Sequence, residues 1–359
     1  MTTSPTTSPT TPDAPATASS GDSGDGIAVV PSQMRAVVQD RYGSPDVLRV
    51  ETIAVPDIRD DEVLIKVDAA GLDRGTWHLV TGWPLLARVA CGLRRPKRRV
   101  PGFDVSGTVV RVGPDARNFG VGDAVCGIGR GSAAEYAPAL ARKLSHRPAD
   151  LDPSAAGTLS ISGITALRAL RDVGRLKPGQ HVLVYGASGG VGTYAVQIAR
   201  SMGAHVTAVC SGAKADMVAA LGAERVLPYD GDHAVDALDG AMQYDVIVDI
   251  AGNRPLRHAR RALAPRGTLA IVGGETGGRL TGGFAGRMLR AIAWSAISRR
   301  RFRSVMPTER GEDIDTVVRL AGSGEIIPQI DRVVGLLDVP AALHDLAAGR
   351  VRGKVAVRP

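Results

Sequence analysis

Cysteine is scarce in this chain of 359 residues, which contains only Cys91, Cys126 and Cys210. Three thiols cannot build a disulfide framework, and their spacing matches no zinc-binding pattern. A disulfide-stapled secreted domain and a cysteine-based metal site are therefore excluded, and the free thiols fit a reducing cytoplasm. Long hydrophobic runs are absent as well, so the sequence predicts no transmembrane span.

Basic residues are missing from the first 33 positions, where Thr, Ser, Pro, Ala and Asp predominate. A signal peptide needs a basic start and an apolar run, and a transit peptide needs arginines. The segment has neither, and it holds too little apolar surface to offset the entropy lost on ordering. We therefore expect residues 1–33 to form a disordered extension.

Aromatic residues make up only 4% of the chain, whereas apolar residues in total reach 44%. The abundant Gly, Ala and Val suit buried parallel strands and closely packed helices. The length allows two domains, each with a substantial core.

The segment Tyr185–Arg200 reads YGASGGVGTYAVQIAR and follows the apolar run His181–Val184. A buried strand, a glycine-rich turn and an amphipathic helix in this order are typical of a dinucleotide site. Ala187, Gly189 and Gly192 occupy the small positions of the G-x-G-x-x-G fingerprint, which serve a tight turn, backbone approach to a pyrophosphate and close helix packing. The N–H groups at the start of the helix then bind the phosphates.

The second strand, Ala204–Val209, indicates which dinucleotide binds. An NAD site carries an acidic residue at the end of this strand, where it holds the ribose 2′-hydroxyl. The chain has Ser211 there instead, with Lys214 close behind, and a hydroxyl and a cation suit a 2′-phosphate. Tyr229, at the end of the next strand, is expected on the adenine side. Taken alone, Lys214 could be an ordinary solvated lysine, so the NADP(H) prediction depends mainly on the missing acid.

Two more apolar runs, Tyr244–Asp249 and Gly267–Val272, complete this half of the sheet. In open parallel sheets, ligands bind beyond the carboxyl ends of the strands. Asn253, Gly273 and Gly274 follow these ends, so we expect them on the nicotinamide side of the site. They would also serve as simple strand-ending turns, and both interpretations stay open.

The front half of the chain consists of short alternating strands between Gly, Pro and Asp, which indicates a small β-rich domain. Together with the run ASGGVG, the segments Phe119–Val125 and Arg352–Val357 make the chain resemble the medium-chain dehydrogenase/reductase superfamily, in its zinc-independent quinone oxidoreductase-like branch. The resemblance extends over nearly everything from Met34 onward. It implies an α/β fold in which a GroES-like β-barrel catalytic domain is interrupted by a Rossmann domain with a doubly wound parallel sheet.

On this resemblance, residues 34–157 and 308–359 form the catalytic domain, and residues 158–307 form the cofactor domain. NADP(H) is expected between them, and the usual assembly of the family is a homodimer. The resemblance also implies the residues that contact the cofactor: Thr165, Ser188, Gly189, Gly190, Val191, Ser211, Lys214, Tyr229, Asn253, Ile271, Val272, Gly273 and Gly274.

Zinc-using relatives carry a Gly-His-Glu segment for the catalytic metal, whereas this chain has Gly102-Phe103-Asp104 at that place. We therefore expect no metal site. Without a Lewis acid, simple alcohol oxidation lacks its usual activator. Hydride transfer to a quinone or an α,β-unsaturated carbonyl needs less, because the protein has only to orient the reactants, exclude water and stabilise the developing enolate.

The acceptor is expected to contact the segment Ala69–His78, where family members carry Asn at the position of Asp73 and often Tyr at that of His78. A carboxylate at Asp73 would favour the oxidised nicotinamide, or a protonated Asp73 in a dry site would donate a proton. His78 could be a proton source as well. Alternatively, Asp73 caps a short helix that contains Thr76–Leu79, and for His78 a structural role is the more expected one.

We therefore predict an NADPH-dependent, zinc-independent oxidoreductase that transfers a hydride to a quinone or an α,β-unsaturated carbonyl. Two kinds of alternative stay open. One is an enoyl-thioester reductase or a metal-free alcohol dehydrogenase. The other is an NADPH-binding structural, regulatory or membrane-associated protein without turnover.

The formal charge of +8 is concentrated in two stretches without acidic residues, Arg88–Arg99 and Arg279–Arg303. In the second, a helical stripe flanked by arginines is formed by Phe284, Met288, Leu289, Ile292 and Ala296. Such a helix could lie at a membrane interface, but we expect a packed or surface element instead. Interleaved aromatic residues and a recognition motif are lacking, so nucleic-acid binding is not expected.

Overall fold

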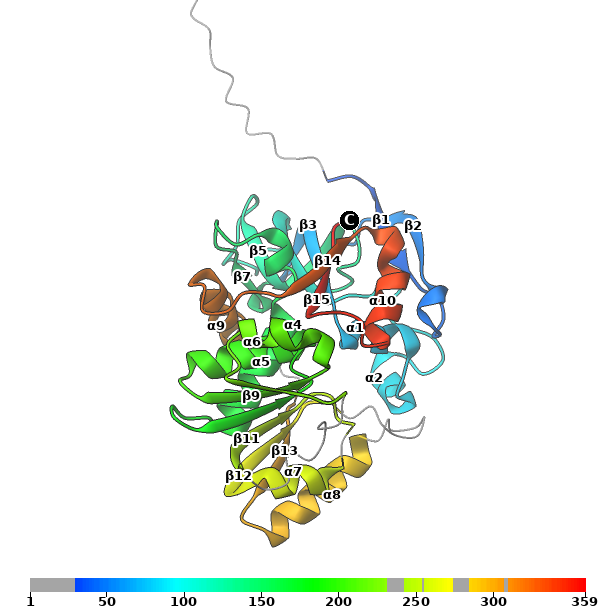
Figure 1. Cartoon of the computed structure of the whole chain (residues 1–359). Helices are drawn as coiled ribbons and strands as arrows, with labels where there is room; N and C mark the ends of the chain where they lie inside the picture. Colours follow the sequence, from blue (N-terminus) through cyan, green and yellow to red (C-terminus); the bar gives the residue numbers. More distant parts are fainter. Residues whose placement is uncertain (1–29, 231–241, 254, 274–283, 307–308) are drawn as a thin grey trace, which may run out of the picture. The chain divides into compact units, whose positions relative to one another are not determined.

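A computed structural model describes residues 30–230, 242–253, 255–273, 284–306 and 309–359 of the chain (Figure 1). Most of the expected disordered extension lies outside these residues. The predicted extension reaches too far at its end, because Gln33 is already the first residue of β1 and pairs with Ala54. Residues Pro31–Pro359 make one compact unit.

The strands fall into a front group, a central group and a C-terminal pair. They are β1 (Gln33–Val38), β2 (Arg49–Ala54), β3 (Glu62–Leu72), β4 (Asp104–Val112), β5 (Ala124–Ile128), β6 (Tyr136–Leu140), β7 (Leu144–His146), β8 (His181–Tyr185), β9 (His205–Cys210), β10 (Arg225–Pro228), β11 (Tyr244–Asp249), β12 (Leu263–Ile271), β13 (Arg301–Ser304), β14 (Ile330–Val334) and β15 (Lys354–Val357). The helices are α1 (Arg74–Thr81), α2 (Arg88–Cys91), α3 (Pro153–Ala156), α4 (Ser160–Arg168), α5 (Gly190–Ser201), α6 (Ala215–Ala220), α7 (Leu256–Ala262), α8 (Phe284–Ile297), α9 (Gly311–Gly322) and α10 (Val339–Ala347).

The central strands form the cofactor-type sheet. In the described residues, six parallel strands lie in the order β10-β9-β8-β11-β12-β13. Successive side chains of β8 point to opposite faces: Val182 and Val184 pack in the core that contains α5, whereas Leu183 and Tyr185 pack in the one that contains α7. Figure 1 shows α5 and α6 on one side of this sheet and α7 and α8 on the other. This doubly covered parallel sheet confirms the predicted Rossmann architecture.

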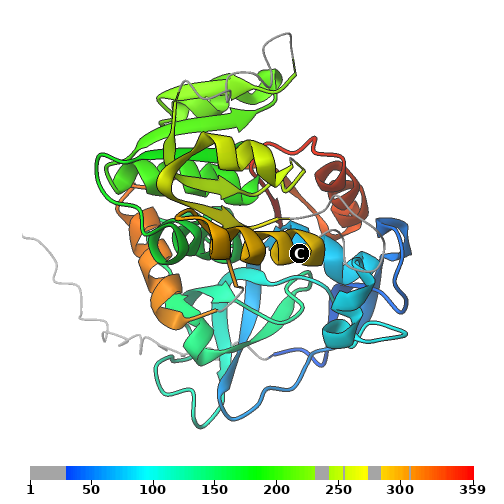
Figure 2. The same ribbon diagram turned by 90° about the horizontal axis from the view of Figure 1, so that it is seen from below.

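Whereas β1 and β2 pair with each other in a small two-stranded sheet, the strands β3 to β7 and the C-terminal pair form a second sheet. Its described strands follow the order β14-β15-β3-β4-β5-β7, with β6 paired to β3, and most neighbours are antiparallel. Ile65 and Val105 of this sheet share a core with Val339 and Leu343 of α10. Figure 2 shows α10, in red, beside the blue front strands. The sheet confirms the predicted GroES-like β domain.

The C-terminal strand connects the two sheets. The N–H of Gly353 donates to Ser188 O at 2.8 Å, and Gly353 forms a parallel bridge with Gly189 in the glycine-rich turn. Only glycine fits there, because φ is +82° and a Cβ would come within 2.2 Å of Gln329 O. β15 therefore begins directly against the predicted phosphate site. No helix in the described ranges combines the length and hydropathy needed to cross a bilayer.

Candidate active site

The glycine-rich turn between β8 and α5 differs by one residue from its prediction. Gly186 has φ of +79° and makes the tight turn, whereas Ala187 is fully buried and does not adopt positive φ. The assignment of the turn to Ala187 was therefore wrong, because a positive φ strains a residue with a Cβ. The packing role of Gly192 is confirmed, since a Cβ there would approach Gly186 O to 2.1 Å.

The predicted phosphate-binding residues surround an open, donor-rich turn. A Cβ added to Gly189 would meet nothing closer than Gly186 O at 3.6 Å, so a ligand has room above it. The first N–H groups of a helix have no acceptor within that helix, and in α5 the N–H of Thr193 is the first with one, Gly189 O at 3.0 Å. Ser188, Gly190 and Val191 lie in the same turn and are half-buried. These features fit a pyrophosphate.

The carboxyl end of β9 carries the residues predicted for a 2′-phosphate. Ser211 follows the strand, and Lys214 ends the short turn Gly212–Lys214. Its Nζ donates to Gly349 O and Val351 O, both at 2.7 Å, and burial lowers the pKa of Lys214. Since an ammonium has three donors, these contacts leave it one for a ligand.

Two further charged residues lie at this edge. Asp230 follows the exposed Tyr229 at the end of β10, and its Oδ1 accepts from Gly212 N at 2.6 Å. Arg352 donates from a terminal guanidinium nitrogen to Ala213 O at 3.3 Å. The acid was missed because only the end of β9 was searched, although β10 pairs with β9 and its end lies at the same edge. No sequence pattern indicated Arg352, which arrives from a segment remote in the chain.

The opposite side of the site follows β11 and β12. The N–H groups of Val272 and Gly273 donate to Asp249 O at 2.9 and 3.2 Å, and a Cβ at Gly273 would come within 2.0 Å of Ile250 O. Asn253 is exposed beyond the end of β11. Ile271 is buried, as expected for the last residue of a central strand, and Gly274 lies outside the described residues.

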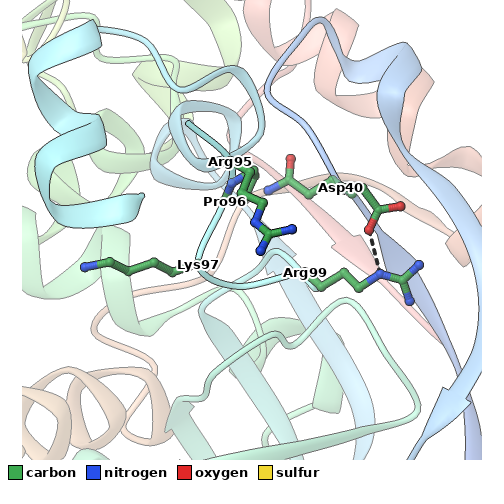
Figure 3. A pocket seen from close by; sticks show the side chains of 6 residues that line it. Asp40, Arg95, Pro96, Lys97 and Arg99 are labelled. Carbon is green, nitrogen blue, oxygen red and sulfur yellow. Dashed lines mark hydrogen bonds and ion pairs between the residues drawn. The ribbon is translucent and has the colours of Figure 1, made fainter. Parts of the chain in front are cut away.

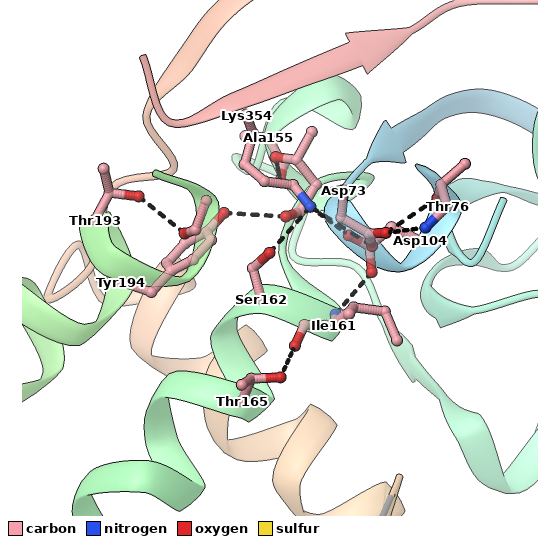
Figure 4. A network of polar contacts seen from close by, with 12 residues as sticks. Asp73, Thr76, Asp104, Ala155, Ile161, Ser162, Thr165, Thr193, Tyr194 and Lys354 are labelled. Atoms are coloured by element: carbon pink, nitrogen blue, oxygen red, sulfur yellow. Dashed lines mark hydrogen bonds and ion pairs between the residues drawn. The ribbon is translucent and has the colours of Figure 1, made fainter. Parts of the chain in front are cut away.

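A cluster of buried charges adjoins the turn, and we call Asp73, Asp104 and Lys354 the charge cluster (Figure 4). Lys354 Nζ is 3.0 Å from Asp104 Oδ2, 3.1 Å from Ser162 Oγ and 4.0 Å from Asp73 Oδ2. All three charged side chains are almost completely buried, with 6% exposure for Asp73 and less for the other two. Isolated buried charges are costly, so this mutual pairing explains how they are tolerated.

Asp73 has two differently bonded oxygens. Oδ1 accepts from Thr76 N at 2.7 Å and from Thr76 Oγ1 at 3.0 Å, which confirms the predicted helix cap of α1. Oδ2 is buried and has no hydrogen-bond partner within the described part of the chain. Oδ1 therefore serves the helix cap, whereas Oδ2 has, among the described residues, only the Lys354 ammonium nearby, at 4.0 Å.

Asp104 determines the protonation of the charge cluster. Burial raises the pKa of Asp104 to about 6, Lys354 opposes this rise, and the Asp73 carboxylate adds to it. Its Oδ1 is also fixed by the N–H of Ile161 at 2.7 Å. Two carboxyl groups thus share a single ammonium, and the cluster can hold one proton close to neutral pH.

Lys354 links this cluster to the cofactor turn. A Cβ at Gly190 would come within 2.9 Å of Lys354 Cδ, so the lysine stem packs directly against the first residue of α5. Thr165, one helical turn after Ile161, donates its hydroxyl proton to Ile161 O at 2.7 Å. Lys354 was missed as a site residue, although a lysine opening the apolar strand Lys354–Val357 is itself a signal of a buried partner.

The contacts of His78 involve the neighbouring residue Trp83. Its Nδ1 lies 2.6 Å from Trp83 O, so this nitrogen carries the proton in the neutral ring. The imidazole also stacks on the Trp83 ring, with centroids 5.7 Å apart and planes 12° apart. These contacts support the structural interpretation of His78.

The metal donors of zinc-using relatives are replaced by groups that bind elsewhere. Among the described residues, no group of three or more His, Cys, Asp or Glu could hold a metal ion. Asp104 is already bonded to Lys354 and to Ile161 N, and burial raises the pKa of Cys126 to about 12, which keeps it a thiol. The residues present therefore do not fit a catalytic zinc.

Comparisons with known proteins cover both sheets. A family model described as an alcohol dehydrogenase GroES-like domain matches residues 59–149, and one described as a zinc-binding dehydrogenase matches residues 190–329. The chain is 31% identical to the chloroplastic quinone-oxidoreductase QR1 of Triphysaria versicolor, over 91% of this chain and 98% of the relative. It is 30% identical to the mitochondrial NAD(P)H oxidoreductase RTN4IP1 of Bos taurus, over 90% of this chain and 89% of the relative.

Solved structures give the same result. The quinone oxidoreductase from Coxiella burnetii is 28% identical, with a TM-score of 0.79 over 91% of this chain and 99% of that chain. A mycobacterial protein complexed with NADPH is 27% identical, with a TM-score of 0.75 over 91% of this chain and 100% of that chain. The likeness therefore extends over both sheets and the segment that connects them.

Proposed function

The chain belongs to the quinone oxidoreductase-like branch of the medium-chain dehydrogenase/reductase superfamily, and we propose that it transfers a hydride from NADPH to a quinone or an α,β-unsaturated carbonyl without zinc. One observation carries this proposal. A buried carboxyl group, Asp73, has an unpartnered oxygen beside Lys354, whose stem packs against the phosphate turn. A carboxyl oxygen without a hydrogen-bond partner thus lies next to the place where a nicotinamide cofactor binds in this family.

Different residues around the turn would bind different parts of the cofactor. The N–H groups at the start of α5 would hold the pyrophosphate. Ser211, the third donor of Lys214 and the guanidinium of Arg352 would hold a 2′-phosphate. Asn253 and Gly273 would border the nicotinamide. When bound, NADPH supplies the hydride.

The charge cluster supplies the proton that the reduced acceptor needs. When carbon accepts the hydride, negative charge develops on the acceptor oxygen. Lys354 relays the proton of Asp104 to Asp73 Oδ2, which passes it to that oxygen, so the O–H bond of the product forms as the Asp104 O–H bond breaks. Two carboxylates then face Lys354 until a proton from solvent restores the starting state.

An acceptor panel tests the reaction class. The purified protein, dialysed against a chelator, is mixed with NADPH and a quinone, an enone, an enoyl thioester or, in the reverse direction, an alcohol with NADP⁺. We expect NADPH oxidation with the quinone or the enone, at a rate that chelation does not change. Turnover of the thioester or the alcohol alone, or loss of activity on chelation, would overturn the proposal.

The Asp73→Asn variant tests the proton route, because Asn caps helices about as well as Asp and leaves α1 intact. We expect kcat to fall about 100-fold with an unchanged Kd for NADPH, since general acid catalysis typically contributes that much. Asp152→Asn is the matched control, because Asp152 also caps a helix, at Ser154 N and Ala155 N, whereas its exposed carboxylate pairs with Arg358 and with no residue of the charge cluster. Equal activities of the two variants would show that Asp73 has no catalytic part.

Cofactor preference tests the 2′-phosphate assignment. We expect Arg352→Ala to weaken NADPH binding about tenfold and leave NADH binding unchanged, because a charge-assisted hydrogen bond to the phosphate is lost. Asp230→Asn should strengthen NADPH binding by removing a like charge. Calorimetry with both coenzymes measures this, and Arg350→Ala, whose arginine pairs with Asp345, serves as the control. No preference for NADPH in the unaltered protein would contradict the assignment.

A further inference from the structure

A stretch without acidic residues connects the start of α1 with β4. Residues 74–103 contain seven lysines and arginines and no aspartate or glutamate. Within this stretch we call residues 85–98 the basic segment, which comprises a helical turn that runs into α2 and the loop that follows it. Four of its cations are exposed and have no carboxylate partner in the described part of the chain: Arg94, Arg95, Lys97 and Arg98.

The helical part of the basic segment has a covered face and an exposed face. On the covered face, Arg88 Nε donates to Gly82 O at 2.9 Å, and the guanidinium lies 4.4 Å from the centroid of the Tyr42 ring. Leu86 and Val89 are 56% and 65% exposed, and their spacing of three positions makes them neighbours on the helix surface. Large apolar side chains that gather at the surface indicate a binding site for a partner or a membrane.

The loop of the basic segment is held in one shape. The N–H of Lys97 donates to Cys91 O at 2.8 Å and closes the loop. Gly92 has φ of +120°, and a Cβ there would come within 2.1 Å of Arg95 O, so the turn requires glycine. Leu93, which is 70% exposed, therefore lies directly before two arginines at a fixed position.

A hollow of about 550 Å³ lies beside this loop, lined by Gln39, Asp40, Arg95, Pro96, Lys97 and Arg99 (Figure 3). Asp40 is already neutralised, because it pairs with Arg49 and, at 2.7 Å, with Arg99. Figure 3 shows Lys97 pointing away from this pair, on the other side of Arg95. Arg95 and Lys97 are therefore available to a phosphate group, to which a guanidinium offers two parallel N–H donors.

Helix α1 connects the basic segment with the charge cluster. It begins after its cap Asp73 and ends at Thr81, a length of about 12 Å at about 1.5 Å per residue. Near its end, the His78 ring stacks on Trp83, and the ring centroids of Trp77 and Trp83 are 6.0 Å apart. The basic segment and the charge cluster thus lie at the two ends of one short helix.

The composition of the basic segment selects among possible partners. A nucleic acid would bind the cations but gain little from the exposed apolar side chains. A second copy of the segment would bring cations against cations, which is unfavourable. A stable protein interface takes about 20–30 residues on each side, more than one helical turn and one loop supply. An anionic bilayer suits both features, because cations bind headgroup phosphates while apolar side chains enter between the acyl chains.

We propose that the basic segment docks the protein on a bilayer rich in anionic glycerophospholipid, and that the acceptor is a long-tailed quinone dissolved in that bilayer. Leu86, Val89 and Leu93 insert at the headgroup boundary, and the four cations bind lipid phosphates. An isoprenoid tail that fills one leaflet spans about 15 Å. The quinone ring therefore reaches Asp73, at the start of α1, while part of its tail stays in lipid.

The assignment of the acceptor rests on the proposed function. The hydride of NADPH adds to a ring carbon of the quinone, and the proton from Asp73 forms one O–H bond. Loss of the carbon-bound proton to water and protonation of the second oxygen then give the aromatic hydroquinone. NADPH, one proton and the quinone thus become NADP⁺ and the hydroquinone, which returns to the bilayer.

Vesicle flotation of the full chain tests the docking, with vesicles of phosphatidylcholine alone or mixed with phosphatidylglycerol. We expect binding only to the mixed vesicles, weakened by salt. The variant Arg94→Gln/Arg95→Gln/Arg98→Gln should lower the partition coefficient about 100-fold, or about fivefold for each arginine. Leu86→Ser/Val89→Ser should lower it about tenfold at unchanged charge.

Three scattered arginines provide the matched control. Arg117, Arg225 and Arg319 are exposed, lie far apart in the sequence and have no carboxylate partner among the residues that the structure describes. The variant Arg117→Gln/Arg225→Gln/Arg319→Gln removes the same charge as the first triple variant. We expect it to keep vesicle binding within about twofold, because charges away from the contact are screened.

Two quinones separate the acceptor from the docking. With a tail-less benzoquinone in solution, all variants should oxidise NADPH at the rate of the unaltered protein, which also shows that they are folded. With a long-tailed isoprenoid quinone dissolved in the mixed vesicles, below saturating lipid, the first triple variant should be about 100-fold slower. The control variant should keep its rate.

Three outcomes would overturn the docking: no binding to the mixed vesicles, equal losses in the two triple variants, and full vesicle binding of Leu86→Ser/Val89→Ser together with binding of duplex DNA, which would identify a nucleic-acid site. Turnover of the tail-less quinone alone, with the protein bound to the vesicles, would overturn the assignment of the acceptor. Failure with both quinones would overturn the proposed function as well, and flotation would still decide the docking.

Discussion

The charge cluster and a set of exposed arginines place charge in opposite environments. The arginines are Arg260 on α7, Arg290 on α8, and Arg299, Arg301 and Arg303 at and just before β13, and we call them the arginine face. In the cluster, Asp104 and Lys354 are buried and 3.0 Å apart, and almost every polar atom has a partner. On the arginine face, guanidinium groups are exposed, and the described residues offer them no carboxylate. Both regions lie on elements of the same compact unit. The net charge of a segment therefore says little until its neighbours are known.

Buried and exposed charges differ in how much their interactions contribute to the stability of the fold. A buried charge that loses its partner is costly, because water cannot replace the missing interaction. Removing the partner of an exposed charge changes the free energy of unfolding very little, because water and salt already screen that charge. Charges that do not stabilise the fold are the ones free to bind something else.

The largest effect is expected for Lys354→Met, which removes the single cation of the cluster. Because Asp104 is then buried without compensation, the free energy of unfolding at neutral pH should fall by about 3–5 kcal/mol. Urea denaturation measures this. The double variant Lys354→Met/Asp104→Asn should recover a large part of the loss, since the amide still accepts from Ile161 N. If the free energy of unfolding of the single variant fell by less than about 1 kcal/mol, the pairing in the cluster would contribute no more than a surface ion pair does.

A smaller, pH-dependent effect is expected for Asp104→Asn. Burial raises the pKa of Asp104 to about 6 from an ordinary value of 3.8, so the folded state binds its proton more tightly than the unfolded state does. This contribution to stability is complete below about pH 4 and is lost as pH rises through about 6. Between pH 4 and pH 7 the variant should therefore gain up to about 3 kcal/mol relative to the unaltered protein. If the free energy of unfolding depended on pH in the same way in both proteins, the raised pKa of Asp104 would be contradicted.

The smallest effect is expected for the variant Arg299→Gln/Arg301→Gln/Arg303→Gln. Since these guanidinium groups are solvated and lack carboxylate partners among the described residues, the free energy of unfolding should change by less than about 0.5 kcal/mol. Thermal unfolding in low and high salt measures this. A loss of several kcal/mol would mean that the arginine face supports the fold after all.

Much of the fold was predictable because the apolar runs in the sequence form strands in the structure. The runs at 181–184, 204–209 and 244–249 all form strands of the parallel sheet, with shifts of at most one residue at their ends. Asp73 was recognised as a cap because an N-cap bond involves only nearby residues. Local patterns of this kind depend on neighbours in the chain, so a sequence reader can see them.

The features that escaped prediction depend on distant partners. Lys354 reaches Asp104 across 250 positions, and Arg352 reaches Ala213 across 139. The burial of Arg287 on α8 follows from its pair with Asp249, which no helical periodicity reveals. Hydrophobic patterns predict which elements form, whereas ion pairs between remote elements decide how those elements are turned.

The order of the charge cluster along the chain has a consequence for synthesis. Asp104 leaves the ribosome 250 residues before Lys354, and burying its carboxylate without that lysine is unfavourable. The nascent front half therefore lacks the cation that compensates Asp104 while the strands of the parallel sheet emerge behind it. The second sheet is complete only when β15 pairs with β3, after the whole parallel sheet has been synthesised.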